Sequence, residues 1–300
     1  MLSIIVLGTA AGGGVPQWNC ACDNCFAART SHAELRATQA SIAISADQEH
    51  WFLINASPDL RQQLTETPAL HPRALRHSPV AGVILTNGEV DAIAGLLTLR
   101  EGAAFNLYGH RRVLDLLDAN PIFNVLKRNL VPRRPIEADV AFEPQLPDGT
   151  PSGLEILPFV APGKAALFVE DTSANEDGDT LGFVIRDKAS DESFVFLAAC
   201  AALTPAVETY LRGARLVFFD GTLFTDDEMI RQGLSQKTGR RMGHMAMAAA
   251  MPTLENLGII RKIFLHINNS NPALMPGAPE RQAVEQAGWQ IPADGMEITL

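Results

Sequence analysis

The chain has 300 residues, of which 47% are hydrophobic and 19% are charged, and its formal net charge at pH 7 is −10. This composition supports a large buried core and excludes a disordered or fibrous protein. An acidic chain repels phosphate backbones and anionic lipid, so we expect neither a nucleic acid nor a membrane surface as a partner.

The N-terminal apolar run Leu2–Leu7 is the first predicted element. It has the length of a strand, and no basic segment precedes it, so it does not read as a secretory signal. No stretch of the chain approaches the roughly 20 apolar residues that a membrane helix needs. We therefore expect a cytoplasmic protein, built as a single domain over residues 1–300 with an insertion near residues 16–30.

The remaining elements alternate between short apolar runs and helical patterns. The predicted strands are 41–45, 51–54, 80–85, 183–186, 193–197, 216–219, 262–266 and 296–300, and the predicted helices are 58–64, 91–100, 206–211, 245–257 and 280–287. Strands and helices interleave, yet hairpins also occur, which favours a mixed α/β sandwich over a pure Rossmann sheet. The glycine-rich loop Gly8–Gly14 lacks the GxGxxG spacing of a dinucleotide site, so we interpret it as a tight loop.

Three cysteines, Cys20, Cys22 and Cys25, fall within six positions after the glycine-rich loop. In a reducing compartment such a cluster favours a metal over disulfides, and thiolates at CxCxxC spacing reach one tetrahedral zinc. The fourth ligand stays open: Asn269, another distant residue or water. The alternative is three free thiols. The fourth cysteine, Cys200, lies in an apolar segment and is interpreted as a small buried side chain.

Polar residues follow three of the predicted strands directly. Asp91 comes shortly after strand 80–85, Asp220 ends strand 216–219, and His266 ends strand 262–266. Ligand sites in α/β proteins form where strand ends meet, so these three side chains are expected to converge around one ion. The alternative for each residue alone is a turn or helix cap.

The segment Thr86–Ala92 is similar to the Thr-His-x-His-x-Asp-His motif of metallo-β-lactamase-fold proteins. It keeps the threonine and Asp91, but Asn87, Glu89 and Ala92 replace the three histidines. The resemblance implies an αββα four-layer sandwich.

Longer segments resemble the PqqB family of pyrroloquinoline quinone (PQQ) biosynthesis, and the resemblance covers essentially the whole chain. These segments are 12–20, 55–59, 95–102, 220–222, 238–244 and 266–272. The family usually lacks the first two histidines of the wider motif, as this chain does. It usually has histidine at the position of Ala92, and this chain does not.

The resemblance implies a structural zinc at the cysteine cluster and a non-heme iron in the active site. That iron would use O2 to hydroxylate the tyrosine ring of a Glu-Tyr precursor derived from the peptide PqqA. Carried over by position, Asp91, Asp220 and His266 would be the iron ligands and catalytic residues. His244 would line the pocket as an acid/base or an additional ligand, and Glu89 is a further candidate ligand if its side chain turns inward.

With alanine in place of histidine at position 92, the site lacks one nitrogen donor, so two other functions stay open. The second hypothesis is a carrier for PQQ or its precursor, with a degraded metal site. The third is a metal-dependent hydrolase, which the missing histidines at 87, 89 and 92 disfavour. The sequence also leaves open whether two copies form a homodimer.

Overall fold

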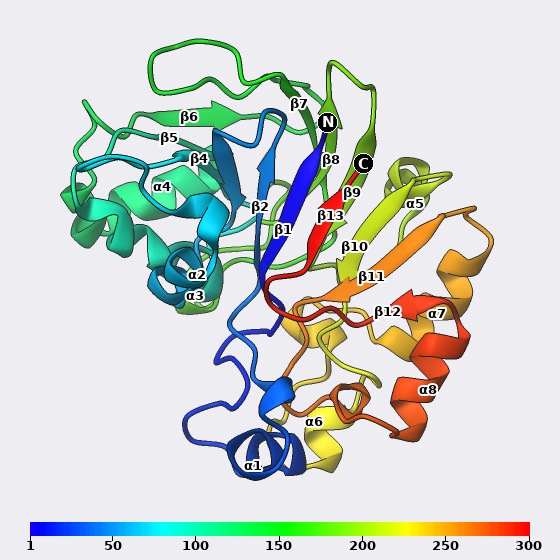
Figure 1. Ribbon diagram of the computed structural model, residues 1–300. Helices are drawn as coiled ribbons and strands as arrows, with labels where there is room; N and C mark the ends of the chain where they lie inside the picture. Colours follow the sequence, from blue (N-terminus) through cyan, green and yellow to red (C-terminus); the bar gives the residue numbers. More distant parts are fainter.

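The computed structural model describes residues 1–300 and contains two β-sheets packed face to face, with helices outside both (Figure 1). The seven-stranded sheet has the order β13-β1-β2-β3-β4-β5-β6, and the six-stranded sheet has the order β12-β11-β10-β9-β8-β7. The predicted α/β four-layer sandwich is therefore confirmed.

Strands of the seven-stranded sheet are β1 (Ser3–Gly8), β2 (Ser41–Ser45), β3 (Trp51–Ile54), β4 (Val80–Ile84), β5 (Asn106–His110), β6 (Arg133–Ile136) and β13 (Glu297–Thr299). Strands of the six-stranded sheet are β7 (Leu154–Val160), β8 (Leu181–Asp187), β9 (Ser193–Leu197), β10 (Leu216–Asp220), β11 (Arg261–Leu265) and β12 (Trp289–Gln290). The first and last strands, β1 and β13, pair antiparallel, which places the two ends of the chain side by side.

The helices divide between the two outer layers. They are α1 (Asp23–Thr30), α2 (Leu60–Glu66), α3 (Val90–Ile93), α4 (Arg111–Ala119), α5 (Pro205–Leu211), α6 (Glu228–Arg231), α7 (Met247–Glu255) and α8 (Pro279–Gln286). Apolar residues of α2, α3 and α4 pack on the seven-stranded sheet, and those of α1, α5, α7 and α8 pack on the six-stranded sheet. A third apolar cluster fills the space between the sheets. No helix combines the length and the apolar character that crossing a membrane demands.

The predicted helix over residues 91–100 is present, but only its first part is α-helical. The α-helix α3 ends at Ile93, and a 3₁₀ segment, Ala94–Arg100, continues the chain. The cause is tertiary: the carbonyl of Ala92 accepts the N–H of Ala56, and the N–H of Gly95 donates to the carbonyl of Ala56. These bonds replace the regular helical ladder. Gly95 is required there because a Cβ would lie only 2.0 Å from the carbonyl oxygen of Ser57.

Two other helices begin later than predicted. α2 begins at Leu60 rather than residue 58, and Ser57 accepts the backbone N–H of Asp59 instead of capping the helix from its first residue. α7 begins at Met247, because the N–H of Met245 donates to the carbonyl of Cys200 outside the helix. That helix runs through Pro252 without interruption.

Candidate metal centre

Two neighbouring parallel strands carry Asp220 and His266 to one edge of the six-stranded sheet. Asp220 is the last residue of β10 and pairs in register with Leu265, the last residue of β11. His266 follows directly and has a left-handed backbone, with φ 61°. This conformation costs a non-glycine residue about 1 kcal/mol. An adjacent tertiary contact holds it, since the next residue, Ile267, donates its N–H to the carbonyl of Thr9 at 2.9 Å.

His244 joins this edge from the loop before α7. Its ring lies 5.1 Å from the ring of His266, centroid to centroid, in a stacked arrangement. Candidate ligand atoms of Asp220, His244 and His266, one from each residue, lie within 4.8 Å of one another. Asp91, from α3 on the other sheet, reaches the same place, because its Oδ2 lies 2.9 Å from Nε2 of His266. The structure therefore brings together all four predicted catalytic residues.

Asp220 is fully buried and accepts four hydrogen bonds. Its Oδ2 accepts the N–H of Cys200 at 3.0 Å and lies 2.8 Å from Nδ1 of His244. Its Oδ1 accepts the N–H of Thr222 at 3.0 Å and the hydroxyl of Thr222 at 2.7 Å. A carboxylate offers about four acceptor positions, so the protein itself satisfies Asp220. In this arrangement, the main effect of Asp220 is to orient the ring of His244.

Thr222 is the functional residue that sequence reasoning missed. Its hydroxyl oxygen lies 3.0 Å from Nδ1 of His244 and 2.8 Å from Nδ1 of His266. If the hydroxyl donates to Asp220, it accepts the Nδ1–H of the imidazoles, and their lone pairs then lie on Nε2, toward the cavity. The available signal was local: an aspartate at the end of a strand can accept the N–H two residues on in an Asx turn, as Asp220 does from Thr222, and this brings the Thr222 side chain close to it.

The ion pair between Asp91 and His266 sets their charge states. Burial is the largest single effect and opposes charge on both groups, but their mutual hydrogen bond and the nearby opposite charges together outweigh it. The pKa of Asp91 is therefore lowered, and the pKa of His266 is raised. A bound cation would take the place of the proton on His266, because a ligating imidazole must be neutral.

Glu89 does not join the histidines and is not part of the candidate ligand group. Its Oε1 lies 2.5 Å from Nζ of Lys164, and its Oε2 accepts the N–H of Leu167 at 3.1 Å. The side chain therefore ties α3 to the segment after β7. The expectation that Glu89 supplements the metal site is corrected by this pairing.

These residues line a cavity of about 300 Å³. Asp91, His244 and His266 form part of its wall, as do Glu89 and Lys164. Ala92 also lines it and is 2% exposed. The cavity is of a size that admits one small molecule.

The three cysteines form a second cluster, at the N-terminus of α1. Their Sγ atoms lie within 4.8 Å of one another. Zinc–sulfur bonds of about 2.3 Å at tetrahedral angles require about 3.8 Å between thiolates, so the cluster fits one zinc with a small contraction. Burial raises the pKa of Cys22 to about 12. For Cys20, hydrogen bonds led by the N–H of Cys22 outweigh burial and lower the pKa.

Asn269 occupies the fourth side of this cluster, as one of the residues predicted for it. Its Nδ2 lies 3.2 Å from Sγ of Cys20, 3.6 Å from that of Cys22 and 3.3 Å from that of Cys25. Rotation of the amide by about 180° would present its carbonyl oxygen to the same point.

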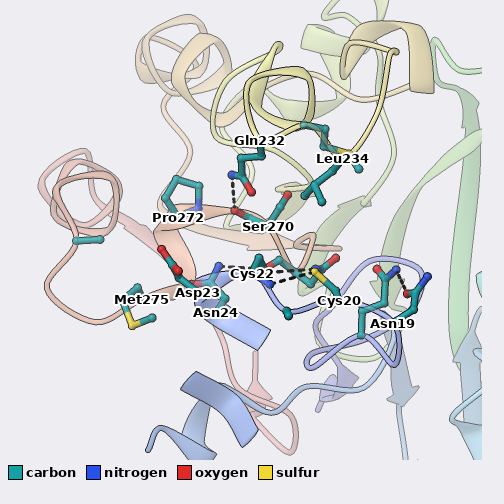
Figure 2. A pocket seen from close by; sticks show the side chains of 15 residues that line it. Asn19, Cys20, Cys22, Asp23, Asn24, Gln232, Leu234, Ser270, Pro272 and Met275 are labelled. Carbon is teal, nitrogen blue, oxygen red and sulfur yellow. Dashed lines mark hydrogen bonds between the residues drawn. The ribbon is translucent and has the colours of Figure 1, made fainter. Parts of the chain in front are cut away.

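The cysteine cluster borders a cavity of about 940 Å³, in which Gln232 and Leu234 lie across from Cys20 and Cys22 (Figure 2). Asn24 connects the cysteine cluster to the histidine site. The Nδ2 of Asn24 donates to the carbonyl oxygens of Asn269 at 3.0 Å and Asn271 at 2.8 Å. The loop that holds the cysteines thus fixes the segment that begins at His266.

Comparison with known proteins decides the family. A protein from Bradyrhizobium diazoefficiens called coenzyme PQQ synthesis protein B is 60% identical over 309 residues, covering 100% of both chains. This chain belongs to the coenzyme PQQ synthesis protein B family. The family's solved structures include Zn²⁺-bound PqqB from Methylobacterium extorquens, which is 42% identical with a TM-score of 0.93 and covers 99% of this chain and 100% of that one.

The wider superfamily is also shown. The model of the beta-lactamase superfamily domain matches residues 50–267. A diphosphatase of the PhnP family has a TM-score of 0.71 at 19% identity, covering 100% of this chain and 98% of that one, which shows a shared fold.

Proposed function

We propose that this chain acts in PQQ synthesis by hydroxylating the tyrosine ring of a Glu-Tyr precursor, with O2 and a non-heme iron. Membership in the PQQ synthesis protein B family supports the pathway. The observation that supports the reaction is the convergence of two imidazoles and carboxylates at one cavity.

The donor set fits ferrous iron. His244 and His266 supply two nitrogens, and Asp91 or Asp220 supplies a carboxylate, which together make the two-histidine, one-carboxylate composition of iron oxygenases. An iron held there would supply O2 activation. The residues themselves bind and orient: Asp220 and Thr222 hold the histidine rings at the cavity.

Zinc is proposed at the second cluster, with a structural role. Cys20, Cys22 and Cys25 supply three thiolates, and the carbonyl oxygen of Asn269 completes the tetrahedron after an amide rotation. The zinc would fix α1 against the loop after β11, which carries His266. The Zn²⁺-bound structure of PqqB from Methylobacterium extorquens supports metal binding in this family.

One observation favours a second function. Ala92 lines the cavity at the position where the motif that segment Thr86–Ala92 resembles has a histidine, so that nitrogen donor is missing from the wall. A cavity that binds the precursor or PQQ without oxidising it would make the chain a carrier.

The test loads the protein with Fe(II) without air, adds Glu-Tyr and then admits O2. Inserting one oxygen atom into a C–H bond leaves the second to be reduced to water, which takes two electrons, so ascorbate is supplied as reductant. A product heavier by one oxygen atom, with O2 uptake, supports hydroxylation. His266→Ala should abolish both, whereas His71→Ala, at an exposed site, should change neither. Binding of Glu-Tyr or PQQ without O2 uptake would instead support the carrier function.

A further inference from the structure

A second hollow adjoins the metal cavity. It has a volume of about 610 Å³, and it shares Gly163, Lys164 and Gly243 with that cavity. Its own wall includes Arg240 and Arg241, from the segment just before His244. The two hollows therefore lie next to each other along these three residues, with the histidines lining one and the arginines lining the other, and together we call them the groove.

The two guanidinium groups have no partner within the protein. Both side chains are exposed, and neither forms an ion pair or a side-chain hydrogen bond, although the chain carries ten net negative charges. The nearby carboxylates are already engaged. Glu170 pairs with Lys237, and Asp226 accepts the backbone N–H of Arg240 at 2.7 Å.

The groove already stabilises a carboxylate of the protein. The pKa of Glu170 is lowered, first by its hydrogen bond to Lys237 and further by the charges of Lys164 and Arg241. A positive field therefore reaches this part of the groove. Lys164 is paired with Glu89 at the junction, so the cations without a carboxylate partner are the two arginines.

The backbone holds the arginines in a fixed relation to the metal centre. They lie in a 3₁₀ turn that ends at Gly243, whose φ of 94° suits glycine. The N–H of His244 donates to the carbonyl of Gly239 at 2.9 Å, closing the turn around both arginines. Arg241 also donates its backbone N–H to the hydroxyl of Thr238.

We propose that Arg240 and Arg241 form a binding site for the carboxylates of a small acidic substrate whose remaining part reaches His244 and His266. Guanidinium groups bind carboxylates through paired hydrogen bonds, so two neighbouring arginines select a molecule with two or more carboxylates. The link to ring hydroxylation rests on the proposed function, whereas the ligand class rests on the groove alone. Glu-Tyr, with its side-chain and terminal carboxylates, meets the requirement.

The test measures binding, so its result does not depend on whether the protein hydroxylates the ligand. The probes are Glu-Tyr, its analogue without carboxylates Gln-Tyr-amide, benzene-1,2,4-tricarboxylate and inorganic phosphate. Wild-type protein should bind Glu-Tyr and the tricarboxylate well above Gln-Tyr-amide, and added salt should weaken both. Phosphate binding that exceeds tricarboxylate binding would overturn the assignment to carboxylates.

The variants are Arg240→Gln, Arg241→Gln and the double variant, with Arg61→Gln as an exposed, unpaired control. Each loss of a charge-assisted contact is expected to raise the Kd for Glu-Tyr by about 10-fold or more, and the double variant should no longer prefer it over Gln-Tyr-amide. Arg241→Lys should restore only part of the affinity, because an ammonium lacks the planar fork.

The outcomes separate the two proposals. Loss of tricarboxylate binding in the double variant, in a protein that shows no hydroxylation, supports the carboxylate site and rejects the reaction. Hydroxylation with an unchanged KM in the double variant rejects the carboxylate site and supports the reaction. Unchanged circular dichroism and metal content would show that the variants are folded, and the salt and tricarboxylate data on wild-type protein test the site without any substitution.

Discussion

Thr222 gives the sharpest test of how the histidines are held. Thr222→Val keeps the shape and removes a hydroxyl that lies 2.7 Å from Oδ1 of Asp220 and 2.8 Å from Nδ1 of His266. Leaving buried polar atoms without a partner costs about 1–3 kcal/mol. Loss of an outer contact of this kind typically reduces metal affinity by about 10–100-fold. We expect that reduction at the histidine site.

Cobalt(II) titration separates the two metal sites, because thiolate ligation produces charge-transfer absorption that imidazole and carboxylate ligands lack. Thr222→Val should weaken the site without that absorption and leave the cysteine site unchanged. Thr222→Ser, which keeps the hydroxyl, should bind cobalt(II) as the wild type does. A lower melting temperature with unchanged cobalt(II) affinity would show that Thr222 supports the fold alone, and the reasoning would be refuted.

The remaining predictions concern single positions of the two sites. Ala92→His adds an imidazole to the cavity wall and should raise Fe(II) affinity by about 10-fold or more, measured by competition with a chelator; no gain would contradict the carry-over of this site. Cys25→Ser should release one zinc per chain by metal analysis and lower the melting temperature by several degrees, at about 2–4 °C per kcal/mol. In metal-free protein, the ion pair of Asp91 and His266 stabilises the fold between their usual pKa values of 3.8 and 6.5. At lower pH the stabilisation is lost as Asp91 takes up a proton near its lowered pKa. At higher pH it is lost as His266 gives up its proton near its raised pKa. Asp91→Asn should therefore reduce the melting temperature near pH 5 more than near pH 9.

The strand-end argument predicted the centre of the site because parallel strands fix it locally. Asp220 and His266 end neighbouring strands in matching register, so their meeting follows from topology. Asp91 also arrives as predicted, although it comes from the opposite sheet. His244 was placed by family resemblance, since a loop between α6 and α7 has no periodicity that could locate its side chain.

Long-range contacts set the limits of the prediction. The partner of Glu89 is Lys164, 75 positions away, and no local pattern couples them. The helix predicted to Arg100 changes from α to 3₁₀ at Ala94, where Ala56 supplies competing backbone hydrogen bonds. Apolar periodicity records which face is buried, and it contains no information about such bonds.

The two carboxylates of the site differ in how freely they can bind a metal. Asp220 would have to give up a hydrogen bond from Cys200, Thr222 or His244, all at a fully buried position. Asp91 lines the cavity and would exchange a single contact with His266 for the metal. Removing a donor from a buried carboxylate is the costlier step. Asp91→Asn should therefore reduce metal affinity and cost less stability at neutral pH than Asp220→Asn does. Asp220→Asn should lower the melting temperature more than Asp91→Asn. The reverse order in chemical denaturation and metal titration would make Asp220 the ligand and Asp91 the residue that supports His266.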